Sequence, residues 1–230
     1  MTELPEDPLK QLVSDFSTRI EYLKVGGMVS GLIMFQVVLL TLMGANNAAR
    51  EIAGERLILE KEKFSGLNPL AYVASKISFL AVLVLVQSVW MSFFVNAIVK
   101  MPGNLLKQTL LLVLVNAAMT AVSLGISGVM ATAEQSSLVS VYLVGFQLPL
   151  SGAVLALPDW LGKLTRPFIA SYWGWAGFLQ TLQETRFYNA VVQMTQTPLM
   201  PVGMVVWVLL GQMMVGFLMA YTGCRGGRWE

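Results

Sequence analysis

The densest group of ionisable side chains in this sequence lies between positions 50 and 63. It holds both signs of charge within a short distance: Arg50, Glu51, Glu55, Arg56, Glu60, Lys61, Glu62 and Lys63. Carboxylate, guanidinium and ammonium groups at this density can form ion pairs with a complementary protein surface. The stretch therefore predicts a site for a binding partner, and the alternative is a helix whose charges are solvated.

The sequence lacks the side-chain patterns of common catalytic and metal sites. It has no histidine, which is the usual proton shuttle and metal ligand. It has no GxxxxGK[ST] motif for nucleotide phosphates, no HExxH motif and no paired carboxylates inside its apolar segments. Cys224 is the only cysteine, so an intrachain disulfide is excluded. We expect no catalytic site, no metal and no cofactor in this chain, and no ATP hydrolysis by the chain alone.

The distribution of charged residues along the chain indicates which class of protein this is. Of the 230 residues 56% are hydrophobic and only 12% are charged, whereas soluble domains have about 25% charged residues. Five windows contain no charged side chain: 25–49, 77–99, 108–133, 135–158 and 187–224. Each can hold the roughly 20 apolar residues that cross a bilayer. The chain is therefore predicted to be an all-α, polytopic transmembrane helical bundle in a lipid bilayer. The net charge of +2 gives no indication of nucleic-acid binding.

Helical spans are expected at about 26–48, 70–99, 106–130, 138–157 and 202–222. Residues 1–24 form a polar lead-in that is either solvated or folded as a short amphipathic helix on a surface. The charged stretch 50–64 is expected to continue the first span without a break, because its residues are good helix formers. Gly66 suits the left-handed position that ends a helix, and Pro69 suits the first turn of the next.

The longest connection between spans covers residues 158–200. It is rich in aromatic side chains, which is typical of a membrane–water interface: Trp160, Phe168, Tyr172, Trp173, Trp175 and Phe178. Residues 167–183 carry no charge but are too few to span a bilayer, so we interpret them as a re-entrant or interfacial helix. Pro149 and Gly152 predict a kink or break in the span before this outer hairpin.

The spans contain uncharged polar residues whose simplest role is hydrogen bonding between helices: Gln36, Asn46, Asn47, Gln87, Asn96, Asn116, Gln147 and Gln212. The absence of charge inside the spans disfavours a proton- or ion-coupled carrier. Orientation is left open by charge, because the side that holds residues 50–63 has 7 basic residues and the other side has 8.

Several short motifs follow one another along the chain. The first is the run Asn47-Ala48-Ala49-Arg50-Glu51-Ile52-Ala53-Gly54-Glu55-Arg56, followed by Glu62-Lys63-Phe64-Ser65-Gly66 and by Tyr72 and Lys76. Later ones, in order, are Ala133-Glu134-Gln135-Ser136, Ser151-Gly152, Pro158-Asp159-Trp160-Leu161 and Tyr172-Trp173. Together these motifs resemble the permease domain of the G (White) subfamily of ABC exporters, and the resemblance covers about residues 25–230.

This resemblance implies a partner and a site. In the family the segment at 50–64 is the coupling helix that docks on an ABC ATPase, which binds ATP and Mg. The implied coupling residues are Arg50, Glu51, Glu55, Arg56, Glu60 and Glu62. Two permease domains, identical or different, would enclose the substrate path by alternating access. Its implied lining is Leu40, Met43, Gly145 and Leu148, with Ala153 and Val154 at an apolar plug. The alternative is that these six residues face lipid or pack between helices.

The chain departs from the family pattern in two respects. The family has six spans and the first has no counterpart here, so we expect a fragment, a split product or a first helix from elsewhere. The outer hairpin lacks the disulfide cysteines of animal members, which favours a bacterial relative in the inner membrane.

We therefore expect a permease subunit of an ATP-driven exporter, at most the membrane part of a translocase. The alternative is a non-transporting membrane scaffold that recruits a cytoplasmic ATPase. An intramembrane enzyme is disfavoured by the lack of histidine and of intramembrane carboxylates. The sequence leaves the substrate open.

Overall fold

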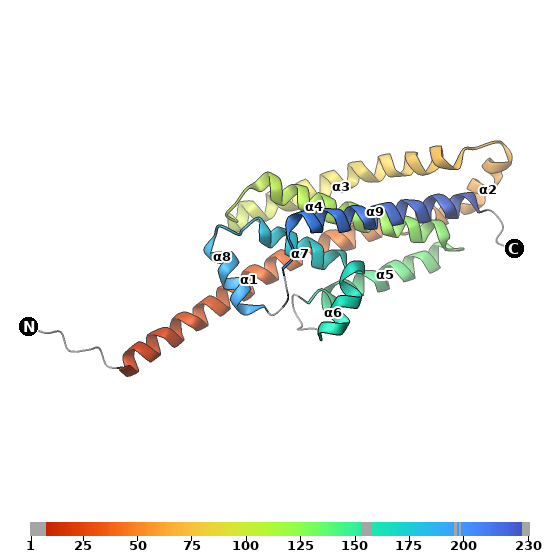
Figure 1. The fold of residues 1–230 in the computed structure, drawn as a ribbon. Helices are drawn as coiled ribbons and strands as arrows, with labels where there is room; N and C mark the ends of the chain where they lie inside the picture. Colours follow the sequence, from red (N-terminus) through yellow and green to blue (C-terminus); the bar gives the residue numbers. More distant parts are fainter. Residues whose placement is uncertain (1–7, 153–157, 196, 198, 227–230) are drawn as a thin grey trace, which may run out of the picture.

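The computed structural model describes residues 8–152, 158–195, 197 and 199–226, and within them all regular structure is helical. The elements in chain order are α1 (Pro8–Ala48), η1 (Ala53–Glu55), α2 (Arg56–Phe64), α3 (Pro69–Val99), α4 (Leu105–Val129), α5 (Ala133–Leu150), α6 (Asp159–Thr165), η2 (Arg166–Phe168), α7 (Ala170–Gln180), α8 (Arg186–Met194) and α9 (Val202–Arg225). The long helices lie side by side in an elongated bundle (Figure 1). The all-α bundle predicted from the sequence is confirmed.

Four of the described helices are long and apolar enough to cross a bilayer: α1, α3, α4 and α9. The limits of α3, α4 and α9 lie within a few residues of the predicted ones. The span expected at 138–157 corresponds, in its described part, to α5, which has 18 residues. Because the first turns of α5 contain Glu134, Gln135 and Ser136 and its last turn Gln147, its 18 residues lack the strongly apolar stretch that the other four helices contain. The described residues therefore supply four such helices rather than five.

Helix α1 is longer than expected. Its 41 residues extend over about 60 Å at 1.5 Å per residue, twice the thickness of a hydrocarbon core. The expected lead-in at 1–24 is not a separate surface helix, because from Pro8 it forms the first turns of α1. These turns project beyond the rest of the bundle (Figure 1), and Phe16 and Ile20 on them are exposed. Residues 1–7 of the lead-in lie outside the described part of the chain.

Helix α4 is the centre of the bundle, and its closest neighbour is α9. Small residues let the two backbones approach: Gly125 and Gly128 on α4 face Gly216, Ala220 and Gly223 on α9. A Cβ atom added at Gly125 would lie 2.6 Å from the Gly216 carbonyl oxygen. Inside a bilayer the hydrophobic effect does not drive helices together. Small residues favour association there because they allow close van der Waals packing of the two backbones.

The outer connection is partly re-entrant, as the sequence suggested. All residues of α7 from Ala170 to Leu179 are buried, and α7 contacts α1, α4 and α9. The indole of Trp175 donates a hydrogen bond to Ser30 Oγ on α1 over 3.0 Å. The aromatic group is therefore not a single interfacial belt. Trp160 and Phe168 are exposed, whereas four of its members form part of the core: Tyr172, Trp173, Trp175 and Phe178.

The predicted break in the fourth span occurs where Pro149 and Gly152 lie. Helix α5 ends at Leu150, and Gly152 adopts a φ of 74°, which is open to glycine without strain. This end turns the chain toward α6, so that α7 can enter the bundle. The rest of the expected span, residues 153–157, lies outside the described residues.

Candidate functional site

The charged stretch forms part of the connector (residues 49–68), which joins α1 to α3 at one end of the bundle (Figure 1). The expectation of one unbroken helix is wrong. Helix α1 ends at Ala48, a turn and the short helix η1 follow, and α2 begins only at Arg56. The predicted end of α2 is confirmed, because Gly66 has a φ of 91° and the Asn68 side chain caps α3 ahead of Pro69.

A serine from α4 accounts for the break after α1. The hydroxyl oxygen of Ser127 accepts hydrogen bonds from the backbone N–H groups of Ile52 and Ala53, over 3.1 and 3.0 Å. Helical continuation would require those two groups to bond to carbonyls four residues earlier. Ile52 and Ala53 are buried, so the connector turns inward at this point before α2 begins.

Arg56 fixes the connector to the carboxyl end of α4. Its side chain is 9% exposed, and its Nη2 donates a hydrogen bond to the Gly128 carbonyl. That carbonyl belongs to the last turn of α4, where four C=O groups lack helical partners and the helix dipole favours a cation. Arg56 therefore serves as an internal cap for α4 rather than as an outward charge.

Lys76 on α3 binds two of the carboxylates of the connector. Its Nζ lies 3.1 Å from Glu51 Oε2 and 2.7 Å from Glu55 Oε1. The Tyr72 hydroxyl, one turn earlier on α3, donates a hydrogen bond to Glu55 Oε2 over 3.0 Å. Because Tyr72 and Lys76 are four residues apart, both side chains reach the connector from the same face of α3.

The hydrogen bond from Lys76 lowers the pKa of the Glu55 carboxyl from its ordinary value; partial burial opposes that shift, and the bond from Tyr72 adds to it. A carboxyl whose pKa is lowered by folding stabilises the fold above its unfolded pKa. The contribution is lost as the pH falls through the lower, folded value. This contact is therefore weakest in acid.

Three of the six predicted charges point away from this anchorage. Arg50 is exposed and donates a hydrogen bond to Ser137 Oγ on α5 over 3.3 Å. Glu60 is half-buried and Glu62 is exposed. The outer face of α2 also carries large apolar side chains that the prediction omitted: Leu57, Ile58 and Phe64, the last of which is 95% exposed.

The structure therefore divides the predicted coupling residues into two sets. Glu51, Glu55 and Arg56 fasten the connector to α3 and α4, while Arg50, Glu60 and Glu62 lie toward its outer side. The anchoring partners Ser127 and Gly128 were missed, since nothing in the local sequence links them to the connector. Through these side chains the connector contacts three helices: α3, α4 and α5.

Residues 10–173, more than half of the chain, match the ABC-2 type transporter family. The chain belongs to this family. Curated proteins give no significant match. An ABC-2 permease is a multi-pass membrane component that works with an ABC ATPase, which fits the apolar helices and the connector at the end of the bundle.

The expected path residues of this permease do not share one surface. Leu40 is wholly buried in the core with Val37 and Val115. Met43 on α1 and Leu148 on α5 are exposed, and Gly145 has open space beside it. Ala153 and Val154 lie outside the described residues.

Inside the permease, polar side chains join three helices. Asn116 on α4 is wholly buried and donates to Ser88 Oγ on α3 over 3.1 Å. Asn47 on α1 donates to Gln87 Oε1 over 3.0 Å, and Gln87 lies beside Ser88. Gln147 and Gln212 also bond between elements. The expected bonding between elements is confirmed for five of the eight residues: Asn47, Gln87, Asn116, Gln147 and Gln212. Gln36 Oε1 has no partner among the described residues.

Asn116→Ala is expected to lower the free energy of unfolding by about 1 kcal/mol, because interhelical hydrogen bonds in membranes are worth about 0.6 and at most about 1.7 kcal/mol. Thermal unfolding in detergent measures this loss. Asn46→Ala is the matched control, since Asn46 is exposed on α1. A double-mutant cycle with Ser88→Ala would contradict the bond if the two losses were additive.

Proposed function

We propose that this permease is the membrane subunit of an ATP-driven exporter and that α2 is the element on which a separate ABC ATPase docks. The observation that carries the proposal is the two-sided connector. One side is fastened to α3 and α4 through Lys76 and Arg56, and the other presents exposed apolar side chains.

Exposed apolar side chains at this position favour a protein partner over solvent. Leu57 and Phe64 are 77% and 95% exposed, beside the charged side chains Lys61 and Glu62. An apolar centre with a charged rim is the usual composition of a protein interface. The alternative, a helix whose charges are only solvated, does not account for these exposed apolar side chains. ATP and Mg would be bound by the ATPase, and its motion on ATP binding would move α2.

The substrate path would lie between two permease domains, identical or different, along the exposed faces of α1 and α5. The exposed side chains there are apolar: Phe35, Leu42 and Met43 on α1, and Tyr142, Phe146 and Leu148 on α5. A path of this composition suits an apolar or amphipathic substrate. In a bacterial inner membrane, α2 would face the cytoplasm.

Phe64→Ala is expected to weaken ATPase binding, because truncating an aromatic anchor at an interface costs about 2 kcal/mol or more. The measurement is the affinity of the solubilised chain for its ATPase, together with the stimulation of ATPase turnover. Phe168→Ala is the matched control, since Phe168 is also exposed but lies on η2, away from the connector.

Equal binding by the Phe64 and Phe168 variants would overturn the docking assignment. If the wild-type chain binds the ATPase but substrate does not stimulate ATPase turnover, the chain would instead be a scaffold that recruits an ATPase for another task.

A further inference from the structure

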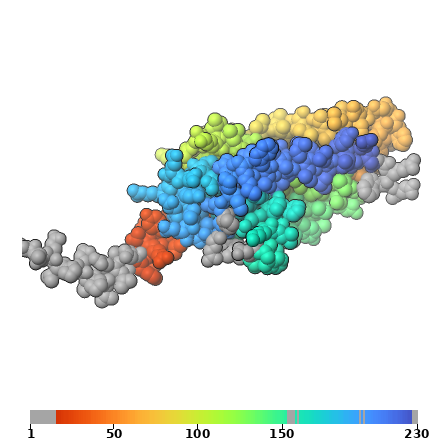
Figure 2. Space-filling view, in the orientation of Figure 1, coloured from red at the N-terminus to blue at the C-terminus, as the bar shows by residue number. Residues whose placement is uncertain are grey.

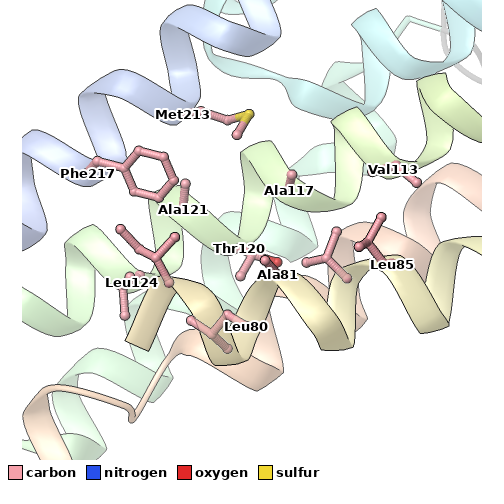
Figure 3. Close-up of a pocket in the computed structure, with 12 residues that line it drawn as sticks. Leu80, Ala81, Leu85, Val113, Ala117, Thr120, Ala121, Leu124, Met213 and Phe217 are labelled. Carbon is pink, nitrogen blue, oxygen red and sulfur yellow. The ribbon is translucent and has the colours of Figure 1, made fainter. Parts of the chain in front are cut away.

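An apolar groove lies between α3 and α9, with α4 as its floor. Figure 3 shows Ala81 and Leu85 of α3 on one wall, Met213 and Phe217 of α9 on the other, and Ala117 of α4 between them. Thr120 is the one hydroxyl-bearing residue of the lining, and its hydroxyl is already bonded to the Asn116 carbonyl. The groove therefore offers contacts to hydrocarbon and no free polar partner.

The groove is lined by apolar side chains and has a cavity volume of about 230 Å³. An extended chain of methylene groups fits this space. A chain in the groove would give the lining atoms dispersion contacts that they lack when it is empty.

The walls of the groove belong to the helices that face lipid. In the apolar windows of α3 and α9 only 22% and 17% of residues are buried, against 67% in α4. Figure 2 shows α9 lying along an open face of the molecule, with α3 beside it. In a bilayer, lipid can therefore enter the groove without displacing any described part of the chain.

Cations lie at the connector end of the groove. Met213, Phe217, Tyr221 and Arg225 recur every fourth residue and form one ridge of α9, which ends in the exposed guanidinium of Arg225. Lys63 of α2 is half-buried near Cys224, one residue before Arg225. No carboxylate lies within ion-pair distance of Lys63 or Arg225 among the described residues, whereas Lys76 is bound to two.

We propose that the groove is a binding site for an anionic phospholipid, with one acyl chain between α3 and α9 and the phosphate group at Lys63 and Arg225. The chain fills the apolar space, and the basic side chains select the headgroup. The site is on the lipid-facing side of α3, away from the exposed faces of α1 and α5. Its chain lies against α3, α4 and α9, whereas its headgroup end reaches Lys63 on α2, next to the docking residue Phe64.

Native mass spectrometry of the full chain in mild detergent tests the site, with phosphatidylglycerol and phosphatidylcholine added in turn. The wild type is expected to retain phosphatidylglycerol in preference. Ala81→Phe places a ring in the groove and is expected to reduce retention of both lipids several-fold. Ala97→Phe is the matched control, because Ala97 is exposed on the same helix outside the groove.

The double variant Lys63→Gln and Arg225→Gln is expected to reduce the preference for phosphatidylglycerol roughly tenfold or more, since each basic residue near a membrane surface contributes about 1 kcal/mol. Ala117→Leu, on the floor, provides a second way to fill the groove. Equal retention by the Ala81 and Ala97 variants would overturn the chain site, and an unchanged preference in the double variant would overturn the headgroup site. A photoreactive residue at position 81 that links to a polypeptide instead of lipid would also overturn the proposal.

Discussion

Lys76→Met is expected to abolish the stimulation of ATPase turnover by the permease while leaving the chain inserted in the membrane. Lys76 is the only cation within ion-pair distance of Glu51 and Glu55 among the described residues. Its loss leaves two neighbouring carboxylates that repel each other and separates α3 from the connector. Lys76 is 16% exposed. We therefore expect its ion pairs to contribute about 1–3 kcal/mol to the free energy that holds the connector on α3, between the values of exposed and buried pairs.

The measurement compares ATPase turnover of the reconstituted complex with the amount of permease recovered in membranes. Glu184→Gln is the control, since Glu184 is an exposed carboxylate outside the connector and a solvated charge contributes little. Adding Glu51→Gln and Glu55→Gln to the Lys76 variant should restore part of the stimulation, because the unpaired charges are then removed. Full stimulation by Lys76→Met alone would show that this anchorage does not transmit movement.

The helix limits followed from charge placement, because a bilayer excludes charged side chains over a fixed length. That rule located α3, α4 and α9 to within a few residues. It failed at the end of α1, where local helix propensity favours continuation. The chain turns there because Ser127, 75 residues away from Ile52 in sequence, binds its backbone. The periodicity of the sequence reports local structure and does not indicate such a long-range contact.

The distinction between core and lipid-facing residues was the part least accessible from the sequence. In a soluble protein, polar residues mark the outer face of a helix, but in a bilayer both faces are apolar. Leu40 and Met43 are therefore alike in sequence, yet Leu40 is buried and Met43 is exposed. The same ambiguity made Trp175 look like an interfacial aromatic, although its indole bonds to Ser30 inside the bundle.

The site was predictable where its residues are local and not where they come from other helices. Glu55, Tyr72 and Lys76 all lie within the motifs that resemble the family, and the spacing of Tyr72 and Lys76 places both on one face of a helix. Their contact with Glu55, 21 residues before Lys76, did not follow from that spacing. The buried position of Arg56 depends on the end of α4, which the motif does not contain. The exposed apolar side chains of α2 could have been noticed, because Leu57, Ile58 and Phe64 interrupt an otherwise charged segment.

Gly216→Ala is expected to destabilise the whole bundle, because it separates α9 from the central helix α4. A Cβ atom at this position would collide with the Ala121 carbonyl group and with Val122 N, which are backbone atoms that cannot move aside. Overpacking of this kind costs about 1–3 kcal/mol and occasionally more. The measurement is the thermal midpoint of the detergent-solubilised chain, which should fall, together with its yield in membranes.

Gly211→Ala is the matched control on the same helix, since an added Cβ there meets nothing within 4 Å. Its midpoint should stay unchanged or rise, because alanine favours the helix over glycine by about 1 kcal/mol. Gly223→Ala, whose Cβ would meet the Gly128 carbonyl, should resemble Gly216→Ala. Equal midpoints for the variants at positions 211 and 216 would contradict the close approach of α4 and α9. The groove that these two helices form with α3 would then have a different shape, so this comparison also tests the geometry on which the lipid site depends.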